Sequence, residues 1–185
     1  MVSGAFTEWQ ANKKGKKIEP IELQAYMKFL IDHQDVIHRY MNLDVVNDAA
    51  ASKRNANIMK ESGLNPIEIW HIGSSLRELD SLIKEDHSLI AIGGSVGVSE
   101  KKRKRVFRRI FKLYYEQNFH FLGGSSRLLN CFPWFSADST GWSVGRMYGS
   151  IIDEKGQRKA PAGMEGLDAL AYNCRYFTSL ELVAS

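Results

Sequence analysis

A single carboxylate, Asp138, follows an aromatic stretch of this 185-residue chain. Residues 132–140 read Phe-Pro-Trp-Phe-Ser-Ala-Asp-Ser-Thr, with aromatic and small residues before the acid and small polar residues after it. This pattern predicts a short buried strand that stops at Asp138. At the end of a barrel strand, a carboxylate can act as nucleophile, general base or metal ligand. The same residue types suit a helix N-cap, so both roles remain open at this point.

Four other residues stand at the ends of predicted strands, where a ligand could bind: Asp44, His71, Gly93 and Gly94. A carboxylate at Asp44 could accept hydrogen bonds from a ligand, or it could cap the helix that follows. Glycines at Gly93 and Gly94 would let the backbone approach a ligand closely, or they could form only a tight turn. His71 could be only a packed or solvent-linked histidine. The indoles of Trp70, Trp134 and Trp142 are expected in the core.

A run of five basic residues opens a predicted helix: Lys101, Lys102, Arg103, Lys104 and Arg105. Cations in the first turns of a helix oppose its macrodipole, by about 0.3–1 kcal/mol each when exposed. Because these cations cost stability, we expect them to have a function, and contact with nucleic-acid phosphates is one such function. The alternative is a solvated helix face.

Composition narrows the class of protein. The length predicts one domain over residues 1–185, and the apolar fraction of 44% is typical of a globular chain. No apolar run approaches the ~20 residues that cross a bilayer, so no membrane partner is predicted. Cys131 and Cys174 do not form a disulfide framework, and we expect a cytoplasmic protein. The net charge of +4 permits a nucleic-acid partner.

Helical and strand patterns alternate along the chain. Strands are predicted at residues 36–46, 66–72, 89–94, 119–122 and 132–138, and helices at 21–33, 47–63, 75–84, 100–117, 125–130 and 167–182. This alternation favours an α/β fold with about five parallel strands, either an incomplete (β/α)8 TIM-type barrel or a doubly wound open sheet. The glycine pairs lack the spacing of a dinucleotide or phosphate-binding loop, so no nucleotide cofactor is predicted.

Six short motifs follow one another in a family-specific order. They are Ser3-Gly4-Ala5-Phe6, Asn42-Leu43-Asp44, His71-Ile72-Gly73, Ala91-Ile92-Gly93-Gly94, His120-Phe121-Leu122-Gly123-Gly124 and Phe135-Ser136-Ala137-Asp138. In this order the chain resembles the tRNA-guanine transglycosylase superfamily. Within it, the chain is most similar to short phage and bacterial members linked to 7-deazaguanine insertion into DNA. The resemblance covers about residues 3–150.

The resemblance implies a (β/α)8 barrel that exchanges guanine for a deazapurine in DNA or tRNA. Asp138 matches the family's nucleophile, and Asp44 matches the aspartate that reads the base. Gly93 and Gly94 match the backbone segment that approaches the base, and His71 lies near a base-contacting glutamine. The basic run, Lys101 to Arg105, would then grip the phosphates beside an extruded nucleotide.

Three departures from the family leave a second interpretation open. Val2 stands where the family has an aspartate, and the chain begins at the first motif, without the first strands of the barrel. The family's zinc site, built from cysteines and a histidine, is missing, so neither a metal nor another cofactor is expected. We therefore expect a homo-oligomer or a partner chain that completes the barrel. The alternative to an enzyme is a non-catalytic nucleic-acid-binding or partner subunit of the same descent.

Overall fold

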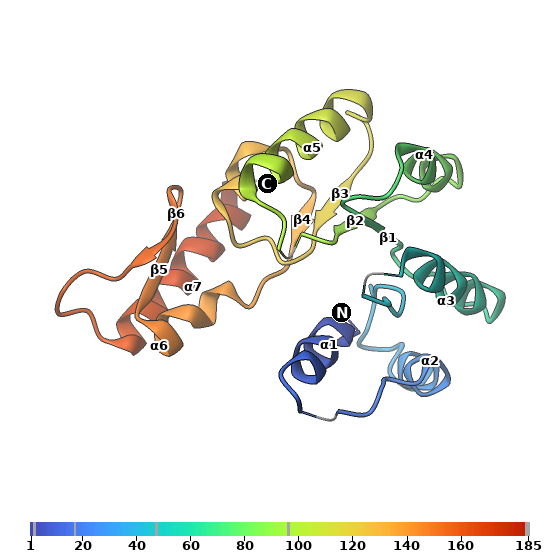
Figure 1. Cartoon of the computed structure of the whole chain (residues 1–185), viewed down its shortest axis with the longest axis horizontal. Helices are drawn as coiled ribbons and strands as arrows, with labels where there is room; N and C mark the ends of the chain where they lie inside the picture. The colour runs from blue at the N-terminus through green and yellow to red at the C-terminus, as the bar shows by residue number, and fades with distance from the viewer. Residues whose placement is uncertain (2, 17, 47, 96, 184–185) are drawn as a thin grey trace. The chain divides into compact units, whose positions relative to one another are not determined.

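The computed structural model of the chain describes residues 1, 3–16, 18–46, 48–95 and 97–183. The chain divides into two compact units, Met1–Val96 and Gly97–Ser185. Each unit combines helices with a pair of parallel strands, and the course of the chain through them can be followed in Figure 1. The α/β class predicted from the sequence is confirmed at this level.

The first unit is built, in chain order, from α1 (Ala5–Lys13), α2 (Leu23–Asp32), α3 (Ala49–Glu61), β1 (Ile69–His71), α4 (Leu76–Lys84) and β2 (Ile90–Gly93). β1 and β2 are parallel, with Ile69 opposite Ala91 and His71 opposite Gly93. Every residue of β2 is buried, as expected for a strand that is covered on both faces. His71 and Gly93 therefore end the two strands side by side.

Side-chain caps fix the start of two of these helices. Ser75 and Glu78 form a capping box at α4, in which each side chain accepts the other residue's backbone N–H. Asp48 accepts the N–H of Ala51 and so caps α3. Asp44 is therefore not the cap of this helix, which removes one of the two roles left open for it.

The sequence analysis fails at two places in the first unit. Residues 36–46 form no strand; the segment makes one isolated parallel bridge, between Met41 and Ile67. The Asn42 side chain interrupts further pairing, because its amide accepts from the Ile69 N–H and donates to the Ser52 carbonyl. The helix α1, which follows Gly4, was missed, since the sequence analysis placed no helix before residue 21. Its apolar residues do not gather on one face, so periodicity does not reveal it.

The second unit is built from α5 (Glu100–Leu113), β3 (Phe119–Phe121), the 3₁₀ turn η1 (Arg127–Cys131), β4 (Ser136–Ala137), the 3₁₀ turn η2 (Gly141–Ser143), α6 (Val144–Tyr148), β5 (Ser150–Asp153), β6 (Gly156–Lys159) and α7 (Gly166–Val183). β3 and β4 are parallel, whereas β5 and β6 form an antiparallel hairpin that the sequence analysis missed. β4 is short and Ala137 is exposed, so the prediction of a buried strand before Asp138 is wrong.

Aromatic rings form the core of the second unit. Trp134 stacks on Phe121 of β3, with ring centroids 4.5 Å apart and an interplanar angle of 17°. Phe107 and Phe111 of α5 contact the same indole edge-on, each with centroids 4.9 Å apart. Such pairs contribute about 0.5–1.5 kcal/mol each beyond the apolar area that they bury. The cluster holds α5, β3 and the segment that leads into β4 together.

No helix among the described residues is long and apolar enough to cross a membrane. The described residues form four parallel strands, with β1 paired to β2 and β3 paired to β4, where about five were predicted. The barrel, and the single domain over residues 1–185, stay predictions.

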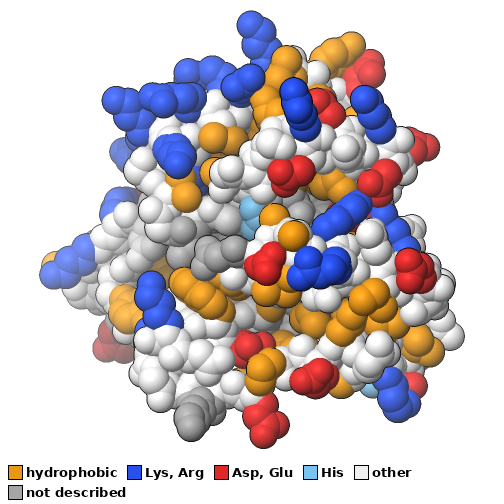
Figure 2. Space-filling model, turned by 45° about the vertical axis from the view of Figure 1, so that its right-hand side comes forward, with side chains coloured by type: hydrophobic (Ala, Val, Ile, Leu, Met, Phe, Trp, Pro, Cys, Tyr) orange, Lys and Arg blue, Asp and Glu red, His pale blue; other side chains and the backbone are white. Residues whose placement is uncertain are grey.

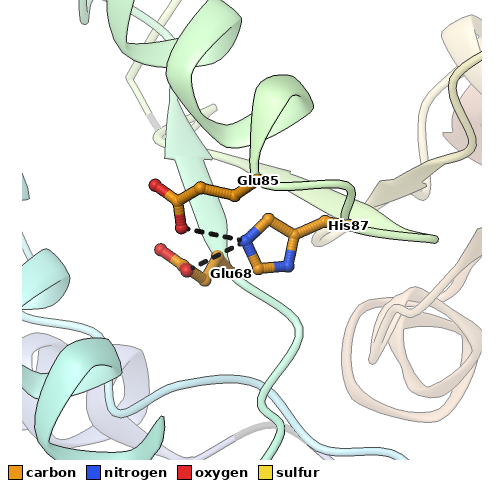
Figure 3. Close-up of side chains that lie close together, drawn as sticks. All are labelled: Glu68, Glu85 and His87. Carbon is orange, nitrogen blue, oxygen red and sulfur yellow. Dashed lines mark hydrogen bonds and ion pairs between the residues drawn. The ribbon is translucent and has the colours of Figure 1, made fainter.

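Charged side chains form a network before β1 and β2 in the first unit (Figure 3). Nε2 of His87 lies 3.1 Å from Glu68 and 3.3 Å from Glu85. Lys53 lies 3.0 Å from each of these carboxylates. Lys60 pairs with Glu68 and lies 2.8 Å from Glu85. Because the Glu68 side chain is only 3% exposed, the network keeps a buried carboxylate paired.

The network shifts the pKa of its members. Burial alone would raise the pKa of Glu68, but His87, Lys60 and Lys53 lower it to about 2. Burial would also raise the pKa of Glu85, and the same three side chains lower it to about 2. Contact with Glu68 raises the pKa of His87. The carboxylates therefore stabilise the fold above pH 4.5, their ordinary pKa, and lose this contribution as the pH falls toward 2. Charged His87 contributes below pH 6.5, and its contribution is lost as the pH rises through its raised pKa.

Replacing Glu68 with glutamine should lower the free energy of unfolding by about 3 kcal/mol at pH 7, because two lysines and His87 lose a buried partner. Denaturant unfolding followed by circular dichroism measures this change. The difference from the wild type should shrink as the pH falls from 4.5 toward 2. Glu61→Gln, at an exposed carboxylate of α3, is the matched control and should change the stability by less than about 0.5 kcal/mol. Equal stabilities of Glu68→Gln and wild type at pH 7 would contradict this role.

Candidate functional site

The pairing of β3 with β4 positions Asp138, which directly follows β4. His120 of β3 lies opposite Ser136 of β4. The Asp138 N–H donates to the Phe121 carbonyl, and the Asp138 carbonyl accepts the Gly124 N–H, so the pairing continues past the end of the strand. Side chains two residues apart on a strand point to the same face. Ser136 and Asp138 therefore both reach the buried ring of His120.

The carboxylate of Asp138 is held at one oxygen and open at the other. Oδ1 accepts the Gly123 N–H at 3.0 Å and lies 3.2 Å from Nε2 of His120. Burial alone would raise the pKa of Asp138, but the contacts with His120 and Gly123 hold it below its usual value. No hydrogen bond from a described residue reaches Oδ2, and the side chain is 39% exposed. Asp138 is thus an anion with one oxygen available to a ligand.

His120 links Asp138 to a hydroxyl. Its Nδ1 lies 2.8 Å from Oγ of Ser136. All three groups are satisfied if Ser136 donates to Nδ1 and the Nε2–H donates to Asp138. A hydrolase triad contains the same three groups, but there the hydroxyl faces Nε2 and the carboxylate is buried. Here the two nitrogens are exchanged and the carboxylate is exposed, so the arrangement favours Asp138 over Ser136 as the nucleophile.

Asp138 opens into a cleft of about 690 Å³ in the second unit. This volume falls within the ~300–1,000 Å³ range of small-ligand sites. Five aromatic residues are among those that line the cleft: Phe132, Trp134, Phe135, Trp142 and Phe177. Trp142 is 45% exposed, so its predicted place in the core is wrong, whereas Trp70 is 3% exposed and belongs to the core as predicted. Trp134 is half-buried and packs in the aromatic core, as predicted.

In the first unit, Asp44 and His71 lie together. Oδ1 of Asp44 accepts the hydroxyl of Ser52 at 2.7 Å and lies 3.0 Å from Nε2 of His71. That histidine nitrogen is at ion-pair distance but is out of line for a hydrogen bond, and no other described residue satisfies it. Burial alone would raise the pKa of Asp44, but His71 and Ser52 hold it below its usual value. Asp44 therefore also is an anion with one oxygen engaged.

The glycines predicted to approach a base lie next to His71. The Gly93 carbonyl accepts the N–H of Ile72 at 3.0 Å. Gly94 has φ +67°, and a Cβ on it would stand 3.1 Å from the Ile72 nitrogen and 3.3 Å from Cβ of His71. Gly94 is thus required by a left-handed turn packed against β1. The tight-turn interpretation accounts for Gly94 without a ligand.

The basic run opens α5, where Ser99 caps the helix. α5 contains eight basic residues and one acidic residue, a net +7, whereas the whole chain has a net charge of +4. Lys101, Lys102 and Arg105 are exposed, while Arg103 and Lys104 are half-buried. Nε of Arg103 is buried, with no hydrogen-bond partner among the described residues. Figure 2 shows a region at the upper left where Lys and Arg side chains gather with few acidic ones.

One group in the described part of the chain could hold a metal by the spacing of its donors: Glu68, Glu85 and His87 (Figure 3). Lys53 and Lys60 already bind both of its carboxylates, so a cation would have to displace two ammonium groups. The cysteines, Cys131 and Cys174, are exposed and free, and neither belongs to this group.

The predicted residues thus fall into three local groups. Asp44, His71, Gly93 and Gly94 lie together in the first unit, Asp138 lies in the second, and the basic run lies at the start of α5. The sequence analysis assigned no role to His120 or Ser136, and it placed Trp142 in the core. The signal for His120 was its place on the strand before Asp138, but its contact depends on the register between β3 and β4.

No protein-family model, no curated protein and no solved structure matches this chain. The role of each group therefore rests on its own geometry and chemistry.

Replacing His120 with phenylalanine should raise the pKa of Asp138 toward its usual value, because a donor to Oδ1 is lost. Carbon-13 NMR of the aspartate carboxyl groups, followed through an acid titration, measures this pKa. His38→Phe, at an exposed histidine in the first unit, is the control and should leave the Asp138 titration unchanged. An Asp138 that titrates identically in the wild type and in folded His120→Phe would contradict the assigned contact.

Proposed function

We propose that this chain is a base-exchange transglycosylase-like protein that replaces guanine with a 7-deazaguanine in DNA or tRNA. The observation that carries the proposal is the carboxylate of Asp138, anchored at Oδ1 and open at Oδ2 in an aromatic cleft. The order of the six sequence motifs supports the same function.

In the proposed reaction, Oδ2 of Asp138 attacks the sugar C1′. The bond from C1′ to N9 of guanine breaks, and guanine leaves after taking up a proton at N9. A glycosyl ester to Asp138 then links protein and nucleic acid, as in a retaining glycosidase. The replacement base gives up its own N9 proton and displaces Asp138 from the vacated side, so the configuration at C1′ is retained. The anchored Oδ1 keeps the carboxylate ionised for the attack.

Asp44 is the proposed reader of the base. A carboxylate can accept two parallel hydrogen bonds, here from N1–H and the exocyclic amine of a guanine-like ring. Ser52 and His71 fix the orientation of this carboxylate and leave Oδ2 for the ligand. His71, Gly93 and Gly94 are the proposed lining of the base pocket, with backbone N–H groups directed to O6.

The proposed architecture is an incomplete (β/α)8 barrel of the transglycosylase type. The four parallel strands, with helices between them, are compatible with this proposal. A second copy or a partner chain would complete the barrel. Large apolar side chains on the second unit offer surface for such a contact: Met147 (58% exposed), Tyr148 (72%) and Leu167 (65%).

The second candidate is a non-catalytic nucleic-acid-binding or partner subunit that descends from such an enzyme. Val2, where the family has an aspartate, favours it. Val2 lies outside the described residues. The basic surface of α5 and the cleft would then bind nucleic acid without bond exchange.

Asp138→Asn should abolish both incorporation of a labelled base and formation of a covalent adduct, because an amide is a poor nucleophile. The assay incubates protein, nucleic acid and labelled guanine, and denaturing gels reveal trapped adduct. Asp44→Asn should instead relax base selectivity, since one acceptor becomes a donor. Asp168→Asn, at an exposed carboxylate of α7, is the control.

Two outcomes would decide against parts of the proposal. Incorporation that survives Asp138→Asn would remove Asp138 from the mechanism. No incorporation by the wild type, alone or with a barrel-completing partner, would favour the non-catalytic candidate.

Replacing Lys101, Lys102 and Arg105 with glutamine should weaken nucleic-acid binding. Each lost phosphate contact reduces the slope of log K against log salt by about 0.9, so the slope should fall by about 2–3. Fluorescence anisotropy across a salt series measures it. The matched control replaces three exposed lysines of the first unit, Lys14, Lys16 and Lys84. If both triple variants change the slope equally, α5 has no special role.

A further inference from the structure

The β5–β6 hairpin has two edges, and α7 covers the edge that belongs to β5 (Figure 1). Ala160 donates its N–H to the Gly149 carbonyl at 2.8 Å, which fixes the alternation of hydrogen bonds along the hairpin. The N–H of Ile152 and the carbonyl of Ser150 therefore point away from β6. The fully buried side chain of Asn173 in α7 binds them at 2.7 Å and 3.1 Å. An amide side chain thus takes the place of a neighbouring strand.

The other edge of the hairpin belongs to β6, and it is open in the part of the chain that the structure describes. The same alternation directs the N–H and the carbonyl of both Gln157 and Lys159 away from β5. Both residues are exposed, and no described residue makes a hydrogen bond to these outward backbone groups. Such an edge can accept one more strand, which supplies the missing main-chain hydrogen bonds.

The side chains along the β6 edge are mainly cationic. Arg158 pairs with Asp153 at 2.7 Å. Lys155 and Lys159 are exposed, and neither makes an ion pair with a described residue. Glu154 is the one exposed acidic residue of the hairpin. Because opposite charges on facing strands stabilise their pairing, this edge suits an acidic strand.

A second copy of the chain suits the β6 edge poorly. Antiparallel pairing about a two-fold axis would place Gln157 opposite Lys159 of the other copy. Arg158 would then lie directly opposite its own counterpart, and the two Lys159 side chains would lie diagonally across the pair. Like charges on facing strands destabilise their pairing, and lysines on edge strands commonly prevent self-association. The same cations that favour an acidic strand therefore disfavour a copy of this one.

We propose that β6 is a docking edge for an extended acidic segment of a partner protein, which joins the β5–β6 hairpin as a third strand. Main-chain hydrogen bonds to Gln157 and Lys159 supply the affinity, and the ammonium groups of Lys155 and Lys159 select acidic side chains. This inference goes beyond the proposed base exchange and does not depend on it.

Fluorescence anisotropy on the full chain tests the proposal, with a fluorescein-labelled peptide of alternating glutamate and valine as the probe. Lys159→Glu should weaken binding about tenfold or more, because an attractive cross-strand charge pair becomes a repulsive one. Lys84→Glu, at an exposed lysine of the first unit, is the matched control and should bind as tightly as the wild type. A peptide with lysine in place of glutamate should also bind about tenfold more weakly.

Amide hydrogen exchange, followed by NMR, gives a second readout that needs no variant. The N–H groups of Gln157 and Lys159 should exchange quickly in the free chain and about tenfold more slowly with saturating acidic peptide. The N–H of Arg158, which faces β5, should exchange slowly in both states.

Several outcomes would overturn the proposal. They are no binding of the acidic peptide at millimolar concentration, equal binding of the acidic and basic peptides, and binding that leaves the exchange of Gln157 and Lys159 unchanged. A single-stranded oligonucleotide that protects these two amides better than the acidic peptide would assign the edge to nucleic acid instead. A dimer in light scattering that protects them without peptide would assign it to a second copy.

Discussion

The stack of Trp134 on Phe121 is the contact on which the second unit depends. Phe121 belongs to β3, and Trp134 immediately precedes the β4 segment. Together with the backbone hydrogen bonds between the two segments, the stack holds β4 beside β3 and so brings Asp138 within reach of His120. Because Phe107 and Phe111 close on the same indole, the orientation of α5 is set by the same contact. An apolar interaction thus fixes the geometry of both the carboxylate and the basic helix.

In the first unit, the amino ends and the carboxyl ends of the parallel strands carry different polar groups. Before β1 and β2, the two glutamates, two lysines and His87 neutralise one another, so little charge remains for a ligand. Beside His71, at the carboxyl end of β1, Asp44 accepts the hydroxyl of Ser52 and stays ionised without a lysine or arginine partner among the described residues. In parallel α/β folds, stability is commonly placed at the amino ends of strands and chemistry at the carboxyl ends. Glu68, whose charge is neutralised by Lys53, Lys60 and His87, fits the stabilising role. Asp44, which lies beside His71, fits the chemical role.

Features that depend on local sequence were predictable, and those that depend on register were not. α4 was found with its start and end, because its cap and apolar stripe are both local. The apolar run of β2 was equally clear. The β5–β6 hairpin and α1 were missed, since neither shows a strong period in its apolar residues. Asp138 was selected from its flanking residues. Its contact with His120 depends on the register between β3 and β4, which cannot be read from a single sequence.

The two aspartates share one arrangement, and it limits the chemistry they can do. In each, Oδ1 lies within ion-pair distance of a histidine nitrogen and accepts a hydrogen bond from another group, the Ser52 hydroxyl for Asp44 and the Gly123 N–H for Asp138. In each, these contacts hold the pKa below its usual value. Both are therefore anions near neutral pH, which suits a nucleophile and a hydrogen-bond acceptor but not a general acid. The proton that a departing guanine takes up at N9 must then come from solvent or from another group.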